Sequence, residues 1–264
     1  LVFFITLFRR NISFRDRLFL SQALNSETIA AVVKYVRKLL LATIIIELIG
    51  FGLGLPVFFT IYGNTPEAYW NSLFLSISAF NNAGFDLFGN TSLMFKPGTI
   101  ISTMPTWAYY YMLSYMMILI ILGGISFVTI MEIFSFKKKP RQYRVFAKIC
   151  ILMTIIIIVF GFLLLMLTDG IPGIKGANTI TSMDALFQTV SARTAGFATF
   201  DANKLSVGGR IVTCCVMLIG GSPLGTAGGI KTTTVFIIIV TIFCYLRGKK
   251  AHAFNRYFSK NMFI

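Results

Sequence analysis

Two short segments of the sequence share the tripeptide Ala-Gly-Phe. They are Asn82-Ala83-Gly84-Phe85 and Thr194-Ala195-Gly196-Phe197. Glycine permits backbone angles that bring several consecutive carbonyl groups toward one point. Carbonyl oxygens arranged in this way can replace the hydration shell of a dehydrated monovalent cation. The two segments are therefore candidates for a cation site built from backbone oxygens, which requires no charged side chain.

The two segments belong to an internal repeat. The pairs Leu73-Phe74 and Leu186-Phe187 lie 113 positions apart, as do Ser78-Ala79 and Ser191-Ala192, and the Ala-Gly-Phe triplets lie 112 apart. Three matches in nearly one register are not expected by chance. The stretches before the triplets, Trp70–Phe80 and Asp184–Ala192, are too short to cross a bilayer, so each predicts a re-entrant pore helix. For one copy alone, a tight turn in an outer loop remains the alternative.

A third segment, Gly220–Gly229, contains five glycines and a proline. Its candidate functional residues are Gly220, Gly221, Ser222, Pro223, Gly225, Thr226, Gly228 and Gly229, with Lys231 just beyond. The surrounding apolar run Ile211–Leu246 would be about 54 Å long as one helix, more than one crossing needs. It therefore predicts a broken helix whose irregular linker lies beside a cavity. Such a linker, placed below a carbonyl site, is suited to be a movable gate.

Alternative readings of this segment are weaker. Gly228-Gly-Ile-Lys-Thr232 loosely resembles a phosphate-binding loop, but the spacing and the preceding strand of that motif are missing.

The elements that position these segments are membrane helices. Apolar residues make up 56% of the 264 residues and charged residues 12%, and the mean hydropathy is +0.79. This composition excludes an ordinary soluble domain. Four apolar runs are long enough to span a bilayer and predict an all-α polytopic membrane protein. They are Leu39–Phe59, Trp107–Phe134, Phe146–Leu167 and Ile211–Leu246.

The net charge of +15 is concentrated in short basic clusters beside the apolar runs. This is the pattern of cytoplasmic loops in membrane proteins, and it argues against nucleic-acid binding. The connection Lys137–Lys148 is basic, as are both ends of the chain, so both ends are predicted to be cytoplasmic and both re-entrant segments to face outward. The acids on the outward side either draw cations to the mouth or are ordinary solvated residues. They are Glu67, Asp86, Asp169, Asp184 and Asp201.

Several single residues carry narrower expectations. Glu47 lies within the first span, where it is either functional or paired with Arg37 or Lys38. Arg193 precedes the second triplet, and we expect it to point away from the pore axis and to bind an acid or a carbonyl. The four cysteines have no metal-type spacing and are expected to be reduced. Residues 1–38 are expected to hold the end of a preceding membrane helix and a cytoplasmic amphipathic connector, Ile12–Lys38.

The motifs together resemble the Ktr/Trk/HKT superfamily of potassium transporters, and look closest to the bacterial Ktr membrane subunit. The resemblance rests on Arg193-Thr-Ala-Gly-Phe197, on Asn81-Asn-Ala-Gly-Phe85, on Arg15-Asp-Arg-Leu18 and on Gly220–Thr234. It implies four membrane-pore-membrane units around one pore, with residues 39–145 as the second unit and residues 146–264 as the third. Gly84 and Gly196 would be two of the four filter glycines, and Gly220–Gly229 the gating loop. The chain departs from the family pattern at Leu224-Gly225, where Gly-Ser is usual.

The resemblance also implies an activity and partners. These are potassium uptake across the plasma membrane, a homodimer, a cytosolic nucleotide-binding regulatory ring and, in some members, activation by sodium. No covalently bound cofactor is implied, and potassium is the transported ion. The first and fourth filter segments are absent from the sequence, so the chain is expected to be a piece of a longer protein. A secondary transporter with a discontinuous helix at its binding site is the alternative, whereas an enzyme would require acid or histidine clusters within the spans.

Overall fold

A computed structural model describes residues 29–87, 105–134, 143–170, 180–248, 252–253 and 256–257. The described part is helical apart from a pairing of two-residue strands, β1 (His252–Ala253) with β2 (Arg256–Tyr257). The helices are α3 (Ile29–Tyr62), α4 (Pro66–Phe80), α5 (Thr106–Gly124), α6 (Phe127–Phe134), α7 (Val145–Asp169), α8 (Ser182–Ala192), the 3-10 turn η3 (Ala202–Lys204), α9 (Val207–Leu218) and α10 (Thr232–Leu246). The fold is all-α, as the sequence predicts. The segment 12–28 of the predicted connector lies outside the described residues.

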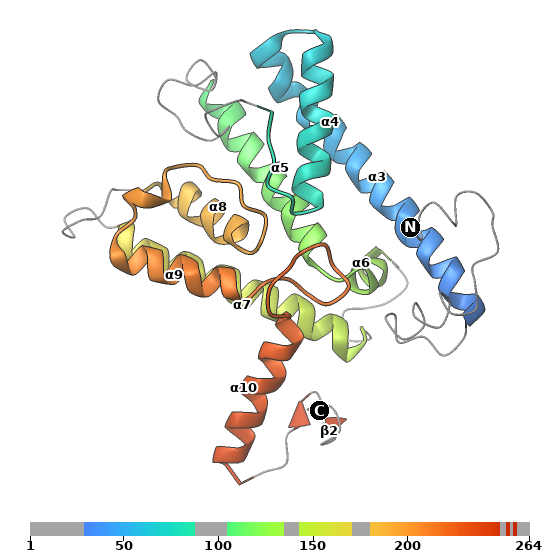
Figure 1. Ribbon diagram of the computed structural model, residues 1–264, viewed down its shortest axis with the longest axis vertical. Helices are drawn as coiled ribbons and strands as arrows, with labels where there is room; N and C mark the ends of the chain where they lie inside the picture. Colours follow the sequence, from blue (N-terminus) through green and yellow to red (C-terminus); the bar gives the residue numbers. More distant parts are fainter. Residues whose placement is uncertain are drawn as a thin grey trace.

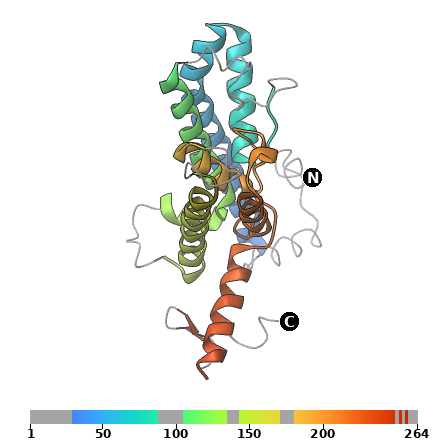
Figure 2. The same ribbon diagram turned by 90° about the vertical axis from the view of Figure 1, so that its left-hand side faces the viewer.

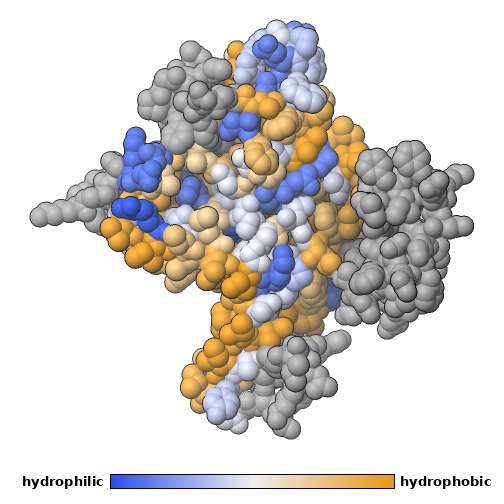
Figure 3. All heavy atoms as spheres, viewed as in Figure 1, coloured by the Kyte–Doolittle hydropathy of each residue, from blue (hydrophilic) through white to orange (hydrophobic). Residues whose placement is uncertain are grey.

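Three of these helices are long and apolar enough to cross a membrane: Arg37–Tyr62 within α3, α5 and α7. Large apolar side chains face outward along them and along α10, as expected for a surface that lipid covers. In Figure 3 hydrophobic residues cover most of the visible surface of α10. Examples of these exposed side chains are Leu41, Phe160, Ile239 and Phe243.

Helix α5 is the central element. It lies between the α3–α4 pair and the group formed by α7, α8 and α9 (Figure 1), and the three helices α3, α4 and α5 run side by side (Figure 2). The core is built mainly from the inner faces of α3, α4 and α5, and α8 adds to it. Its largest fully buried side chains include Phe80, Phe187, Met112, Leu113 and Met116. Both re-entrant helices therefore pack against the same spanning helix.

Helix α4 packs closely on α3 because small residues face each other. Gly50 and Gly54 lie one turn apart on α3, and a Cβ atom at either would overlap the hydroxyl of a serine on α4. Ser76 donates to the carbonyl of Glu47 and Ser72 to that of Phe51, both at 2.7 Å. Such small-residue contacts are a common way to join helices in lipid, where apolar burial provides no driving force.

Short helices are present at both positions predicted for re-entrant segments, with α4 beginning four residues before the predicted start and α8 two residues before it. Their re-entry into a membrane stays a prediction. The break predicted in the last apolar run is also present, because α9 ends at Leu218 and α10 begins at Thr232.

The prediction of one continuous span over Trp107–Phe134 is wrong. Helix α5 ends at Gly124 and α6 begins at Phe127, so Ile125 and Ser126 interrupt the run. Two adjacent glycines weaken the helix at this point. The interruption is stabilised from outside, because another part of the chain supplies the hydrogen bonds that a continuous helix would have made.

Candidate functional site

The first Ala-Gly-Phe segment forms a tight turn directly after α4. We call residues Asn81–Phe85 the first turn. Asn82 and Gly84 both have left-handed backbone conformations, with φ of 52° and 75°. The hydroxyl of Ser78 accepts from the N–H of Phe85 (3.0 Å) and donates to its carbonyl (2.7 Å). The last turn of the pore helix therefore holds the far end of the turn.

The second segment, Arg193–Phe197, forms an equivalent turn after α8 and is called the second turn. Thr194 and Gly196 are left-handed, with φ of 83° and 90°. The hydroxyl of Ser191 donates to the carbonyl of Phe197, and the carbonyl of Ser191 accepts from the N–H of Ala195 at 2.9 Å. The two left-handed residues and the serine hydroxyl that donates to the phenylalanine carbonyl thus recur at the spacing of the sequence repeat.

The two serines belong to the candidate site, and the sequence-based site prediction did not include them. The available signal was the pair of matching Ser-Ala dipeptides, which had been used only to align the repeat. A serine hydroxyl one turn before a helix end can reach backbone groups that have no helical partner. Ser78 and Ser191 both do so here.

The two turns lie against each other, backbone to backbone. A Cβ atom at Gly84 would overlap the carbonyl oxygen of Ala195 and lie 3.3 Å from the Cα of Gly196. Glycine at position 84 is therefore required both by its positive φ and by this close approach. The arrangement brings together two segments that are more than a hundred residues apart in the chain.

Among the carbonyl groups of the two turns, the six that belong to the predicted filter segments before each phenylalanine accept no hydrogen bond from any residue that the structure describes. They belong to Asn82, Ala83, Gly84, Thr194, Ala195 and Gly196. Free carbonyls are hard oxygen donors that suit monovalent cations. By contrast, no group of three His, Cys, Asp or Glu side chains in the described residues is placed to hold a metal ion.

The glycine-rich segment Gly220–Gly229, which we call the strip, is a narrow loop closed at its base. Ile219 and Ile230 form a parallel bridge, and the N–H of Gly220 donates to the carbonyl of Ile230 at 3.1 Å. Further along, the N–H of Gly221 donates to the carbonyl of Gly228 at 3.2 Å. A Cβ atom at Gly220 would overlap that same carbonyl, so the two limbs of the loop can approach only because glycine is present.

The strip is seated in the interruption between α5 and α6 (Figure 1). Its N–H groups at Ser222 and Thr226 donate to the carbonyls of Gly124 (2.9 Å) and Gly123 (3.0 Å). Conversely, the N–H of Phe127 donates to the carbonyl of Leu224 at 3.2 Å. An interruption leaves carbonyl groups at the end of α5 and N–H groups at the start of α6 without helical partners. Backbone groups left unpaired between α5 and α6 therefore form hydrogen bonds with the backbone of the strip, which is the longer break between α9 and α10.

The strip also contacts both turns. The hydroxyl of Thr226 donates to the carbonyl of Phe80 (3.0 Å) and accepts from the side-chain amide of Asn82 (2.8 Å). The N–H of Gly228 donates to the hydroxyl of Thr194 at 3.2 Å. The site residues predicted from the sequence, although spread over about 150 positions, are thus brought together in one place.

Arg193 links the second turn to the base of the strip. Its guanidinium is buried and donates to the carbonyl of Gly220 at 3.4 Å. The expectation that Arg193 binds an acid or a carbonyl is confirmed, because its partner is a carbonyl. That its side chain points away from a pore axis stays a prediction. At the other end of the strip, Lys231 donates to the carbonyl of Ala227 at 2.9 Å. Pro223 and Gly225 lie in the tip that occupies the α5–α6 interruption.

Glu47 is not paired with Arg37 or Lys38, so that reading is wrong. Its carboxylate accepts instead from the side-chain amide of Asn81 at 2.7 Å. Glu47, on the first predicted span, thereby binds the side chain of the first residue of the first turn. The other reading, that Glu47 serves the site, is strengthened by this position.

Two of the acids considered for an outer mouth are buried structural acceptors. Asp169 binds the N–H and hydroxyl of Ser206 at the start of α9, at 2.7 and 3.0 Å. Asp184 accepts from the hydroxyls of Tyr109 (2.8 Å) and Thr181 (2.5 Å). For these two the reading as ordinary solvated residues is wrong, because both are buried and their carboxylates link helices. That their charges draw cations stays a prediction.

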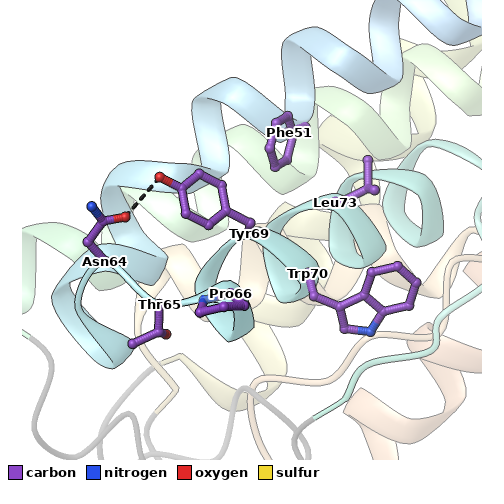
Figure 4. A pocket seen from close by; sticks show the side chains of 7 residues that line it. All are labelled: Phe51, Asn64, Thr65, Pro66, Tyr69, Trp70 and Leu73. Carbon is purple, nitrogen blue, oxygen red and sulfur yellow. Dashed lines mark hydrogen bonds between the residues drawn. The ribbon is translucent and has the colours of Figure 1, made fainter.

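A cavity of about 450 Å³ lies elsewhere, at the connection between α3 and α4 (Figure 4). It is mostly apolar, and its one drawn hydrogen bond joins the hydroxyl of Tyr69 to the side chain of Asn64 at 2.8 Å. Its lining contains none of the turn or strip residues: Phe51, Asn64, Thr65, Pro66, Tyr69, Trp70 and Leu73. All four cysteines are free, as expected.

Comparisons with known proteins identify the family of the chain. The family model described as "Cation transport protein" (TrkH) matches residues 1–262. The potassium/sodium uptake protein NtpJ of Enterococcus hirae is 31% identical over 97% of this chain and 54% of its own length. The Ktr system potassium uptake protein D of Bacillus subtilis is 31% identical over 92% of this chain and 52% of its own length. The chain therefore spans about half the length of these relatives.

A solved structure shows the same fold. The crystal structure of the potassium transporter TrkH from Vibrio parahaemolyticus superposes with a TM-score of 0.58 and 19% sequence identity, over 84% of this chain and 42% of that one. The family match and the similar sequences indicate the same family, and the solved structure has the same fold. The chain belongs to the TrkH family of cation transport proteins and is integral to a membrane.

Proposed function

We propose that this chain supplies two of the filter segments of a potassium-conducting pore and the gate that lies below them. The observation that carries the proposal is the pair of equivalent turns, which lie against each other and keep six carbonyl groups free of hydrogen bonds. Unpaired carbonyls at membrane depth must line a protein or water cavity. Helices α4 and α8 both end at the turns, and their C-terminal ends add partial negative charge there.

The strip is the proposed gate. It is irregular backbone between two apolar helices, and such backbone persists in a membrane only next to a cavity. Its contacts with Thr194, Asn82 and the α5–α6 interruption place it directly beside the turns. It is held by hydrogen bonds rather than by a large apolar core, so parts of it can move at moderate cost.

Transport is proposed for a whole protein of the relatives' length, about half of which this chain spans. Residues 39–145 and 146–264 would be the second and third of four membrane-pore-membrane units. In the same proposal the protein lies in the plasma membrane with both ends of this segment in the cytoplasm. It forms a homodimer, binds a cytosolic nucleotide-binding ring and responds to sodium. A secondary transporter for another solute is less well supported, because the hydroxyls of Ser222 and Thr226 in the broken helix are already hydrogen-bonded.

The filter is tested in the full-length protein, expressed in cells that lack their own potassium uptake. Gly196→Ser places a side chain at φ +90°, which costs about 1–2 kcal/mol and is enough to alter selectivity about tenfold. The measurement is the ratio of potassium to sodium uptake. Gly63→Ser is the matched control, since Gly63 has φ +66° in open space at the α3–α4 turn. An unchanged ratio in the Gly196 variant, with normal protein in the membrane, contradicts the filter assignment.

The gate is tested by deleting Gly220–Gly229 in the same protein. Removal of the strip is expected to raise potassium flux, because the obstruction beside the turns is gone. Flux is normalised to the amount of protein in the membrane, measured by quantitative immunoblotting. An unchanged flux per molecule contradicts the gate assignment and leaves the filter test unaffected.

A further inference from the structure

The hydroxyl of Thr226 makes two contacts outside the strip, and both are with the first unit of the repeat. It donates to the carbonyl of Phe80, the last residue of α4, at 3.0 Å. It accepts from the side-chain amide of Asn82, in the first turn, at 2.8 Å. One hydroxyl on the strip therefore bridges the end of a pore helix and the turn that follows it, across more than 140 positions of sequence.

Both partners need support of this kind. The chain leaves the helix after Phe80, so its carbonyl has lost the helical N–H that would otherwise bind it. Asn82 is a non-glycine residue at φ 52°, a conformation that persists only when its surroundings hold it. Its side chain is about nine-tenths buried, so water is a poor substitute for the hydroxyl.

The packing around the bridge leaves space for this hydroxyl and for little else. A Cβ atom at Gly123 would overlap the carbonyl oxygen of Phe80 and would lie 2.9 Å from the hydroxyl oxygen of Thr226. Glycine at position 123 therefore allows α5, the end of α4 and the strip to meet at one point. The N–H of Thr226 is fixed at the same place, because it donates to the carbonyl of Gly123.

We propose that Thr226 is a positioning residue for ion selectivity: its hydroxyl, carried on the strip, sets the shape of the first turn. The proposal rests on the filter and gate assignments made above. Its consequence is that gate and filter are one coupled device. The contacts of Thr226 with Phe80 and Asn82 therefore persist while the pore conducts, and opening moves other parts of the strip.

The test compares Thr226→Val with Thr226→Ser in the full-length protein. Valine has nearly the same shape without the hydroxyl, and serine keeps the hydroxyl without the methyl group. The valine variant is expected to lower the ratio of potassium to sodium uptake about fivefold, and the serine variant to stay within about twofold of the original. Thr213→Val is the matched control, since the buried hydroxyl of Thr213 binds only its own helix, at Gly209.

A purely structural role is separated from positioning by the readout. A structural role would lower the amount of folded protein and the uptake of both ions alike, with an unchanged ratio, and that result overturns the proposal. If the valine variant does not reach the membrane, Thr226→Ala removes the hydroxyl with a smaller side chain and carries the same expectation.

A double-variant cycle tests the route of the effect. If Thr226 acts through Asn82, the changes in the uptake ratio caused by Thr226→Val and Asn82→Ala are less than additive. Full additivity overturns the proposed route. Failure of this inference is distinguishable from failure of the filter assignment. An unchanged ratio in Thr226→Val together with an altered ratio in Gly196→Ser rejects only the role of Thr226, whereas unchanged ratios in both reject the filter itself.

Discussion

The two turns share one backbone plan but are held by different means. At the first turn, the contact with the strip is made by a side chain of the strip, because the hydroxyl of Thr226 accepts from the side-chain amide of Asn82. At the second turn, the contact with the strip is made by side chains of the turn itself: the hydroxyl of Thr194 and the guanidinium of Arg193 both bind the backbone of the strip. A repeated backbone can thus be stabilised at each copy by whichever partner has a suitable side chain.

The turns also differ in how far this chain encloses them. The phenylalanine that ends the first turn, Phe85, is 68% exposed, whereas Phe197 in the second turn is 4% exposed. Ala195 and Phe197 of the second turn are both buried in the core, whereas the exposed Phe85 gives the first turn one open side. Equivalent substitutions in the two turns should therefore have unequal effects, which allows the comparison to be tested.

The largest effect is expected for Arg193→Met, which removes the charged link from the second turn to the strip. A hydrogen bond from a charged group contributes about 1.5–3 kcal/mol, so potassium uptake per molecule should change by about tenfold or more. Met retains much of the apolar volume, and Arg193→Gln, which keeps an N–H donor, should lie between Met and the original. Equal uptake in all three proteins would show that the contact with Gly220 does not hold the second turn.

Replacing the two equivalent serines should destabilise the protein unequally, because Phe197 of the second turn is buried and Phe85 of the first is exposed. Ser191→Ala leaves the carbonyl of buried Phe197 without a donor, which costs about 1–3 kcal/mol. Ser78→Ala frees the backbone of exposed Phe85, where water can replace the hydroxyl, so the cost should be less than about 1 kcal/mol. Thermal unfolding of the purified protein measures both. The order would be reversed only if the first turn were the more enclosed of the two in the whole protein.

A smaller effect is expected at Leu224, where the strip meets the N–H of Phe127. Leu224 has φ 61°, and a non-glycine residue there costs about 1–2 kcal/mol. Leu224→Gly relieves this cost while the carbonyl contact remains, so the seated strip becomes more stable. If seating closes the pore, potassium flux should fall about fivefold. A rise in flux would indicate that the seated strip is the conducting state.

The sequence predicted the turns and the broken last helix because both signals are local. Matching dipeptides at constant spacing, and five glycines with a proline in ten residues, point to particular positions. The interruption at Ile125 and Ser126 was not predicted because the run around it is continuously apolar. Glycine pairs are tolerated inside membrane helices, and here the break depends on hydrogen bonds from a strip about a hundred residues later.

Side-chain partners were the least predictable part of the site. Glu47 has basic residues nearby in sequence, yet its partner Asn81 is 34 positions away. The bridge from Thr226 to Asn82 spans 144 positions and requires α5 to bring the strip against α4. Such contacts are decided by packing of the whole chain. Local sequence patterns could name the residues of the site but not which of them bind each other.

The smallest effect is expected for the acid at the start of the first pore helix. Both pore helices carry an acid in the first turn, Glu67 in α4 and Asp184 in α8, but Glu67 is exposed whereas Asp184 is buried and bound to Tyr109. Glu67→Gln removes only a solvated charge, so potassium uptake should fall by less than about twofold, and only at low ionic strength, where surface charges are poorly screened. Uptake measured at low and at physiological salt tests this directly. An effect that persists at high salt would mean that Glu67 acts by contact, as Asp184 does, and α4 and α8 would then be more alike at their N-terminal ends than the structure indicates.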